Sequence, residues 1–350
     1  MSSLKNIKGL SYQELEKVFV SLQEKPFRAK QVYEWLWKKS ASSFEEMTNL
    51  SKQLRDKLEK NFSLDSTTIH TKQLSHDKTI KYIFKLPDDN KVEGVLIPTA
   101  SRMTACISSQ VGCSLSCKFC ATGYLDRKRN LEAYEIYDQV VNIAKEAEEN
   151  YQIPLSNIVY MGMGEPLLNY QNTLKSVEYI TSDKGLGMSP KRITVSTAGI
   201  AKMIKKLGDD QVKFNLALSL HAANDEKRNK IMPINESNSL ASLKEALMYF
   251  YQKTKSKVTY EYIVFHGVND TLEDAQELYA FTKHTPCKVN IIEYNPISQA
   301  NYSNAHEDAI AQFQKYLEKK GVITNVRRSR GKDIDAACGQ LAGKEKAPME

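Results

Sequence analysis

Three cysteines stand close together in the stretch GCSLSCKFCATG, residues 112–123. Cys113, Cys117 and Cys120 follow a C-x3-C-x2-C spacing, and clustered thiolates bind zinc or iron–sulfur clusters. A structural zinc site takes four ligands, and neither a cysteine nor a histidine follows Cys120 at the spacing of a zinc knuckle. A [4Fe–4S] cluster normally takes four cysteines, so three would leave one iron open to a small molecule. The motif therefore predicts a metal centre whose ligands are these three cysteines.

The composition is typical of a globular protein in a reducing compartment. Only six of the 350 residues are cysteine, too few for a disulfide framework. The mean hydropathy is -0.48, and no apolar run approaches the length of a membrane span. The first residues also lack the apolar segment of a secretory signal. We therefore predict a soluble, cytoplasmic protein with no membrane partner.

The charge of the chain is moderately basic, with a net value of +7. Three basic runs lie beside the motifs described below: DRKRN (126–130), SPKR (189–192) and NVRRSRGKD (325–333). Any one of these runs is typical of a solvated surface. Three of them next to candidate functional segments favour a nucleic acid as the partner.

The elements that position the motifs fall into two groups, and the first is a small module ending near residue 98. Apolar residues recur at helical spacing over 11–23, 27–39 and 43–60. Two runs of strand-forming residues, 79–86 and 91–98, flank the turn PDDN, which is the pattern of a β-hairpin. The sequence therefore predicts an α-helical and β-hairpin accessory domain over its first part.

The second group, residues 99–342, alternates candidate strands with amphipathic helical stretches such as 132–149 and 271–284. Repeated β-then-α units imply parallel strands with right-handed crossovers. This α/β pattern suits a partial (β/α)6 barrel or a doubly wound sheet, and residues 343–350 form a tail. The candidate strands are 103–109, 157–162, 192–197, 213–220, 258–265 and 289–295.

Unusual segments follow the carboxyl ends of these strands. GMGEP (162–166) follows the second strand, STAG (196–199) the third, SLHA (219–222) the fourth and YNP (294–296) the sixth. Barrels and open α/β sheets place their active sites at this edge. Glycine, proline and asparagine can simply end a strand, but strand termination does not explain an acid such as Glu165.

The motifs resemble those of a known family. CSLSCKFC resembles the cluster motif of radical S-adenosylmethionine (SAM) enzymes. CISSQVGCSLSCKFCATG, MGMGEPLLN, RITVSTAGI, LALSLHAANDEKRNKIMPIN, YNP and RGKDIDAACGQL together resemble the RlmN/Cfr group of RNA adenine methyltransferases. FRAKQVYEWLWKK and SFEEMTNLSKQLRDKL are similar to the N-terminal module of the RlmN members. The resemblance implies a radical-SAM barrel preceded by an accessory, RNA-binding domain over residues 1–98.

The same resemblance implies the cofactors. The three clustered cysteines would hold a [4Fe–4S] cluster, and the amino and carboxylate groups of SAM would chelate its open iron. Reduction of the cluster would use an external electron donor of the flavodoxin kind. The positions that match SAM contacts of the family are Gly164, Glu165, Ser196, Ser219, Leu220, His221 and Asn295.

Three further residues match the chemistry of the group. One SAM methylates a cysteine, Cys338 here, and a radical from a second SAM takes a hydrogen from that methyl group. The carbon radical then adds to C2 of adenine, an electron-poor carbon that cannot attack a methyl sulfonium. Cys106 matches the cysteine that resolves the protein–RNA link, and Glu93 matches the base that removes the C2 proton.

The residues alone leave alternatives open for these three positions. Cys106 and Cys338 could be small buried hydrophobes. Glu93 could be an acid that faces solvent from an edge strand, or, by strand alternation, one buried among apolar neighbours such as Val95 and suited to proton transfer. Cys287 matches no family role and is expected to be structural.

The resemblance also contains a choice of product. RlmN members methylate C2 of adenine, whereas Cfr members also methylate C8 and confer antibiotic resistance. GEPLLN, which includes Pro166, and the N-terminal helices favour C2. The implied partners are an adenine in the peptidyl-transferase region of 23S rRNA and the adenine just 3′ of some tRNA anticodons, and we predict a monomer. An alternative of another class is a non-enzymatic RNA-binding protein with a structural metal site, and His266 stays unassigned.

Overall fold

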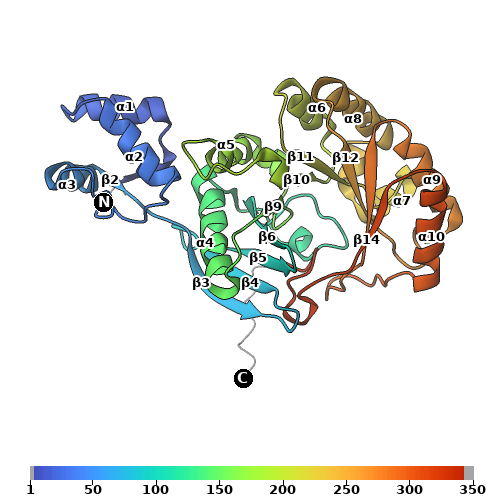
Figure 1. Cartoon of the computed structure of the whole chain (residues 1–350). Helices are drawn as coiled ribbons and strands as arrows, with labels where there is room; N and C mark the ends of the chain where they lie inside the picture. The colour runs from blue at the N-terminus through green and yellow to red at the C-terminus, as the bar shows by residue number, and fades with distance from the viewer. Residues whose placement is uncertain (1–3, 343–350) are drawn as a thin grey trace.

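A 10-stranded sheet organises the protein, whose computed structural model describes residues 4–342 (Figure 1). Strands β14 and β3 form its two edges. In order across the sheet the strands are β14 (Thr324–Arg327), β13 (Cys287–Ile292), β12 (Val258–Ile263), β11 (Asn215–Ser219), β10 (Ile193–Thr197), β9 (Asn157–Tyr160), β6 (Arg102–Cys106), β5 (Lys91–Thr99), β4 (Ile80–Lys85) and β3 (Thr68–Leu74).

In this sheet β6 and the strands β9 to β14 are parallel and follow one another in chain order. Every strand predicted between residues 99 and 342 is present, so the predicted α/β pattern is confirmed. Strand β14 was not predicted, because TNVR has no run of apolar residues and becomes a strand only by pairing with β13, where Val289 lies opposite Thr324. Residues of β12 are buried along its whole length, as expected for a strand covered on both faces.

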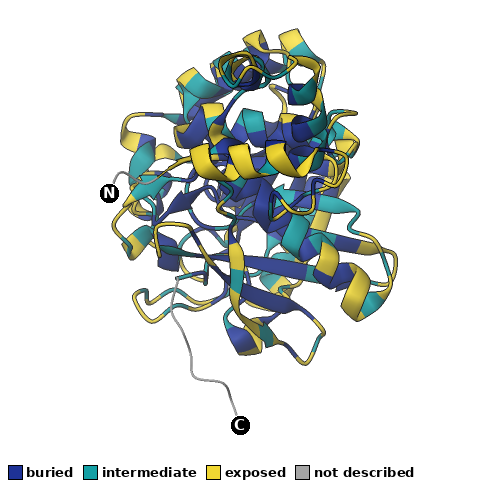
Figure 2. Cartoon of the chain, turned by 90° about the vertical axis from the view of Figure 1, so that its left-hand side faces the viewer, coloured by how far each residue is buried: buried dark blue, intermediate teal, exposed yellow. Residues whose placement is uncertain are grey.

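Helices cover the outer side of the parallel strands. Figure 2 shows that their exposed residues face outward, whereas the strands are mostly buried. Helices α4 and α5, α6 and α8, and α9 and α10 pack in pairs. Within residues 4–342 the structure contains no helix with the length and apolar character that a membrane crossing requires. The helices are α4 (Ala133–Tyr151), α5 (Tyr170–Thr181), α6 (Ala201–Asp209), α7 (Asp225–Ile231), α8 (Leu240–Thr254), α9 (Leu272–Thr282) and α10 (Glu307–Lys319).

The predicted hairpin is present as β4 and β5, and it continues the main sheet. β5 pairs antiparallel with β6, so that Val95 lies opposite Cys106, and β3 adds a further antiparallel strand beyond β4. The domain boundary predicted at residue 98 therefore falls inside β5, where Pro98 lies opposite Met103 of β6, and it stays a prediction.

Three N-terminal helices, α1 (Tyr12–Ser21), α2 (Phe27–Trp37) and α3 (Lys52–Asn61), lie to one side of the sheet in Figure 1. The helix predicted over 43–60 begins only at Lys52, so the prediction was wrong for residues 43–51. Glu46 accepts hydrogen bonds from the backbone and hydroxyl of Ser42, which folds that segment into a turn. Ser51 then caps α3 by accepting from the N–H of Leu54.

Two buried contacts fix this helical group against the rest of the protein. The Trp37 ring stacks on Tyr179 of α5, with centroids 3.6 Å apart and planes 8° apart. The Lys8 ammonium lies 2.9 Å from the Asp138 carboxylate of α4, with both side chains buried. Stacked aromatic rings and a paired buried charge hold one geometry, so the N-terminal helices have a defined position beside the sheet.

Candidate active site

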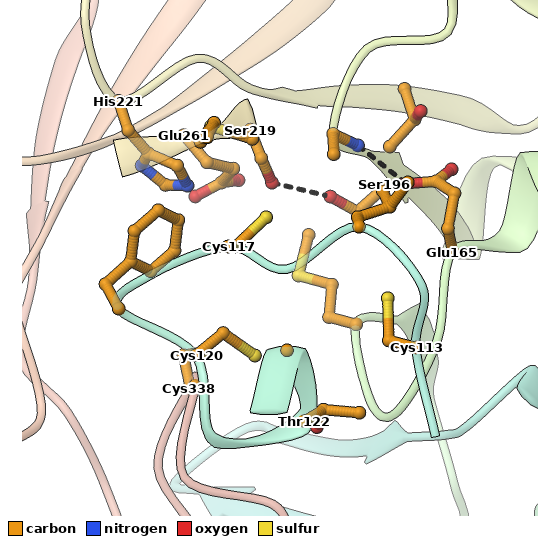
Figure 3. Close-up of a pocket in the computed structure, with 18 of the residues that line it drawn as sticks. Cys113, Cys117, Cys120, Thr122, Glu165, Ser196, Ser219, His221, Glu261 and Cys338 are labelled. Carbon is orange, nitrogen blue, oxygen red and sulfur yellow. Dashed lines mark hydrogen bonds between the residues drawn. The ribbon is translucent and has the colours of Figure 1, made fainter. Parts of the chain in front are cut away.

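The three cysteines of the sequence motif lie on one loop after β7 (Gln110–Val111) and line a single pocket (Figure 3). Residues at and just after the carboxyl ends of the parallel strands form much of the rest of the wall. Gly112 begins the loop with φ +76, and a Cβ here would lie 2.1 Å from the carbonyl oxygen of Asp126. Only glycine fits that approach, so the loop that displays the thiols depends on it.

The donor set of this loop fits an iron–sulfur cluster. Burial raises the pKa of Cys113 to about 11 and also raises the pKa of Cys117 and of Cys120. Metal binding must therefore release protons from these thiols. Across residues 4–342, no three Cys, His, Asp or Glu side chains are placed to hold one metal ion. A cluster does not require such convergence, because each thiolate binds a separate iron.

Gly164 and Glu165 line the same pocket after β9. Gly164 has φ +93, and a Cβ there would lie 2.5 Å from Cβ of Gln110. Glu165 is buried; its Oε1 accepts from the N–H of Leu167 over 3.0 Å and its Oε2 from the N–H of Ala198 over 2.7 Å. Burial raises the pKa of Glu165 to about 7, and these hydrogen bonds oppose the rise. Each oxygen keeps a second lone pair that can accept from an amino group in the pocket.

Ser196 on β10 and Ser219 on β11 face each other, with their Oγ atoms 3.4 Å apart (Figure 3). Behind them lies the fully buried guanidinium of Arg228. Its Nη2 donates to the carbonyls of Ala198 (2.6 Å) and Ser219 (3.2 Å), and its Nε donates to the carbonyl of Leu220 (3.0 Å). The side chain of Leu220 is fully buried, and its backbone belongs to this network. Arg228 therefore fixes the strand ends that carry the predicted SAM contacts.

His221 lines the pocket as a neutral hydrogen-bond donor. Its Nδ1 accepts from the N–H of Ile263 over 3.1 Å, so the ring proton is on Nε2. Burial, together with the smaller effect of the nearby charge of Arg228, lowers the pKa of His221 to about 3. The ring packs edge-on against Phe119, 4.7 Å between centroids. The predicted contact at His221 is thus held in one orientation by its neighbours.

Three buried polar atoms at the pocket have no hydrogen-bond partner among residues 4–342: Glu261 Oε2, Tyr294 Oη and Asn295 Oδ1. Glu261 and Tyr294 line the pocket, and Asn295 adjoins it. Buried polar atoms are nearly always satisfied, so these three indicate space for a polar ligand. SAM carries hydroxyl, amino and ammonium groups that can donate to such atoms. The residues that line the pocket therefore fit SAM as a ligand.

The C-terminal segment 336–342 passes beside the cysteine loop. The hydroxyl of Thr122 donates to the carbonyl of Leu341 over 2.6 Å, and Asn295 Nδ2 donates to the carbonyl of Cys338 over 3.1 Å. Cys338 is exposed and lines the pocket of the clustered cysteines, so its open surface faces a cavity. The structure thus brings Cys338 to the site from the far end of the chain.

Cys106, at the end of β6, is buried and shares a second pocket with Cys338. Cys338, Met161 and Ile292 line both pockets, so Cys338 lies between the clustered cysteines and Cys106. The surrounding protein desolvates both thiols, Cys338 within the cavity that it faces, and so raises the pKa of each, while the charge of Arg327 opposes the rise. Arginines of the segment 327–330 form the basic side of this second pocket.

Glu93 lies on the interior strand β5 and is 1% exposed, so the interpretation as a solvent-facing edge acid was wrong. Its Oε2 accepts from the N–H of Ala342 over 3.0 Å, and its Oε1 lies 3.6 Å from the buried ammonium of Lys81. The described lining of the two pockets around Cys338 does not include Glu93. The structure therefore ties Glu93 to the C-terminal segment rather than opening it to Cys338.

The sequence interpretation missed Glu261, Arg228 and Lys81. Glu261 lies inside a buried strand, and only the pairing of β11 with β12 brings it opposite Ser219. Arg228 belongs to a motif quoted above, but a basic residue in a polar helix reads as exposed. Lys81 was missed for the same reason, because a basic residue in a hairpin strand also reads as exposed. The signal that could have indicated its burial was strand alternation around Glu93.

Comparisons with known proteins match two parts of the chain to family models. Residues 5–64 match the family model of the ribosomal RNA large subunit methyltransferase N-terminal domain. Residues 107–281 match the model of the radical SAM superfamily. The first match spans the N-terminal helices, and the second contains the cysteine loop and most of the parallel strands.

Curated relatives and a solved structure agree with these models. A protein of Cytophaga hutchinsonii, named probable dual-specificity RNA methyltransferase RlmN, is 67% identical over 97% of this chain and 93% of its own length. The dual-specificity RNA methyltransferase RlmN of Geobacter sulfurreducens is 43% identical over 98% of this chain and 94% of its own length. The crystal structure of a radical SAM methyltransferase from Sphaerobacter thermophilus superposes with a TM-score of 0.91 and 37% identity, over 97% of this chain and 100% of that one.

The predicted radical-SAM barrel is confirmed by this superposition, and the predicted family by the full-length similarity to the relatives. The chain belongs to the RlmN family of the radical SAM superfamily.

Proposed function

We propose that this protein is a radical SAM methyltransferase that methylates C2 of an adenine in 23S rRNA and of the adenine just 3′ of some tRNA anticodons. The names of its relatives describe RNA methyltransferases of dual specificity. One observation carries the proposal: Cys338 lines both the pocket of the clustered cysteines and the pocket of Cys106. A methyl carrier needs access to the methyl source on one side and to the acceptor on the other.

The first pocket would hold the cofactors. A [4Fe–4S] cluster on the three clustered cysteines, with SAM on its open iron and an electron from a flavodoxin-like donor, supplies a 5′-deoxyadenosyl radical. Glu165 can accept from the ammonium of SAM, and His221 can donate from Nε2. Ser196 and Ser219 offer hydroxyls to the adenosyl part. Most of this wall is buried, which excludes water from a reactive intermediate.

Cys338 would carry the methyl group. Its thiol takes a methyl group from one SAM and loses its proton, giving S-methylcysteine. Transfer of one hydrogen atom from that methyl group to the 5′-deoxyadenosyl radical would leave a carbon radical, which would bond to C2 of the adenine. Asn295 holds the carbonyl of Cys338, so the methyl group stays directed at the site while the reaction proceeds.

Glu93 and Cys106 would complete the reaction. Loss of one electron, which the oxidised cluster would take back, and of the C2 proton would restore the aromatic ring, and Glu93 would accept that proton once the bound RNA brings C2 to it. The Cys106 thiol would then lose its proton and bond to the sulfur of Cys338, while the bond between this sulfur and the transferred carbon breaks. The electron pair stays with the carbon, which takes a proton and becomes the methyl group. The pocket shared by Cys106 and Cys338 supports this step.

The RNA would reach the second pocket along its basic side. Arg327, Arg328 and Arg330 line this pocket, and the chain carries a net charge of +7. Arginine pairs with phosphate oxygens, and such contacts position a nucleic acid without specifying its sequence. The cytoplasmic location, the electron donor and the monomeric state stay predictions.

Nucleoside analysis tests the proposal. The anaerobically prepared, cluster-loaded protein is incubated with reductant, methyl-labelled SAM and either 23S rRNA or total tRNA, and the digested RNA is examined by mass spectrometry. We expect 2-methyladenosine from both RNAs. If the product is 8-methyladenosine, the protein carries out the Cfr-type methylation of C8, and the proposed methylation of C2 is wrong. Zinc-loaded protein that binds RNA and transfers no methyl group would support the alternative of an RNA-binding protein.

A further inference from the structure

Glu261 is a buried carboxylate in the middle of the site that the family motifs leave without a role. It lies on β12, is 3% exposed and lines the pocket of the clustered cysteines. Register places it opposite Ser219 on β11 and opposite Asn290 on β13. Figure 3 shows its carboxylate beside Ser219 and His221.

A row of polar side chains crosses the sheet through Glu261. On one side, the Oγ atoms of Ser196 and Ser219 lie 3.4 Å apart. On the other side, Asn290 Nδ2 donates to Glu261 Oε1 over 2.8 Å, and Asn325 Nδ2 donates to Asn290 Oδ1 over 3.3 Å. This row fixes one oxygen of Glu261 and leaves the other for the pocket.

The second oxygen, Oε2, has no hydrogen-bond partner among the described residues. Arg327 Nη1 lies 3.7 Å from it, which is within range of charge attraction but too long for a hydrogen bond. Burial raises the pKa of Glu261, and Arg327 and Asn290 oppose that rise. A buried carboxylate oxygen without a donor is costly, so its presence in a ligand pocket points to a donor that the ligand brings.

We propose that Glu261 Oε2 accepts a hydrogen bond from a ribose hydroxyl of SAM, with the hydroxyl of Ser219 beside it. Carboxylates recognise the ribose hydroxyls of adenosyl cofactors in other α/β folds, because the two oxygens accept from hydroxyl donors. The ammonium of SAM has a separate acceptor in Glu165, which follows β9 and is separated from Glu261 by β10 and β11. The inference rests on the proposed function, since it requires that this pocket binds SAM.

Equilibrium binding to the cluster-loaded protein tests the inference. Calorimetry under anaerobic conditions compares S-adenosylhomocysteine, which cannot donate a methyl group, with its 2′-deoxy and 3′-deoxy analogues. A hydrogen bond to a charged group predicts that Glu261→Gln weakens binding of S-adenosylhomocysteine about tenfold or more. The same variant should change the affinity for one of the two deoxy analogues by less than about twofold, since that analogue lacks the bonded hydroxyl. Glu226→Gln, whose side chain is 80% exposed, removes the same charge as a control.

Each result decides between the proposals. Equal loss for all three ligands, or no loss for any, overturns the assignment of Glu261 to the ribose. If Glu261→Gln does not fold, the wild-type protein still gives a test, because one deoxy analogue must then bind about tenfold more weakly than S-adenosylhomocysteine. Wild-type protein that binds neither SAM nor S-adenosylhomocysteine contradicts the proposed function itself.

Discussion

Glu93 and Ala342 lie 249 positions apart in the chain, yet the backbone N–H of Ala342 donates to Glu93 Oε2 over 3.0 Å. The segment that ends at Ala342 also carries Cys338, whose carbonyl is held by Asn295. The residue proposed as the base therefore also anchors the segment that carries the proposed methyl group. Substitutions at Glu93 can separate these two roles.

Glu93→Gln keeps an oxygen that can accept from Ala342 but cannot take a proton from C2. In this variant we expect the amides of the C-terminal segment to stay protected from hydrogen exchange. We also expect a protein–RNA cross-link to accumulate. Glu93→Leu loses both roles, so amide hydrogen exchange over residues 336–342 should become faster. Exchange measured by mass spectrometry compares the two variants, and equal protection in both would show that the contact with Ala342 does not hold the segment.

Cys106→Ala should leave the methylated and coupled Cys338 without its resolving thiol. We expect a covalent complex with labelled RNA that survives a denaturing gel and exceeds the wild-type amount more than about tenfold, as blocking one chemical step by 1.4 kcal/mol or more would give. Cys338→Ala should form no complex. Cys287→Ala is the control, because this thiol contacts the carbonyl of Thr282, away from both pockets. A wild-type amount of complex from Cys106→Ala would contradict its role.

Glu165 should make the metal-free protein lose stability as pH rises. Burial raises its pKa from 4.5 to about 7, so between these values the folded state keeps a proton that the unfolded chain releases. The free energy of unfolding is therefore highest below pH 4.5 and falls by up to about 3 kcal/mol as the pH rises to about 7. Glu165→Gln removes this dependence. Urea unfolding at a series of pH values measures the difference, and parallel curves for the two proteins would contradict the shift.

Arg228→Met should destabilise the fold because it removes the donors that hold the carbonyls of Ala198, Ser219 and Leu220. Loss of a buried charged donor with several acceptors predicts about 3 kcal/mol or more. Lys230→Met, at a side chain that is 66% exposed, should change the free energy of unfolding by less than about 0.5 kcal/mol. Urea unfolding compares the two, and similar values would exclude a structural role for Arg228.

Gly112→Ala should prevent the cysteine loop from holding its metal, because the new Cβ would lie 2.1 Å from Asp126 O. Gly267→Ala is a matched control, since Gly267 also has positive φ but has no atom within 4 Å of its Cβ position. Both variants carry the backbone strain of about 1–2 kcal/mol, whereas only the first carries the clash. Iron and sulfide analysis after reconstitution should show a large loss for Gly112→Ala alone. Equal iron content would mean that the loop tolerates the Cβ.

Much of the fold follows from short-range patterns in the sequence. Strand and helix periodicity located β6 and the strands β9 to β13, and the order of those strands along the chain gave the parallel arrangement. The start of α3 was misplaced because Ser51 provides a cap that periodicity does not register. Strand β14 was missed because its four residues gain their extended form from pairing with β13, and not from their own propensity.

The groups that could do chemistry can be recognised in the amino-acid sequence: three thiols at cluster spacing, and polar residues where parallel strands end. Which of these groups meet depends on the folded structure. Cys338 comes to lie between two pockets, Glu93 receives the N–H of Ala342, and Glu261 comes opposite Ser219. These contacts join segments far apart in the chain. Strand register and burial set them, and neither quantity is encoded in the local spacing of residues.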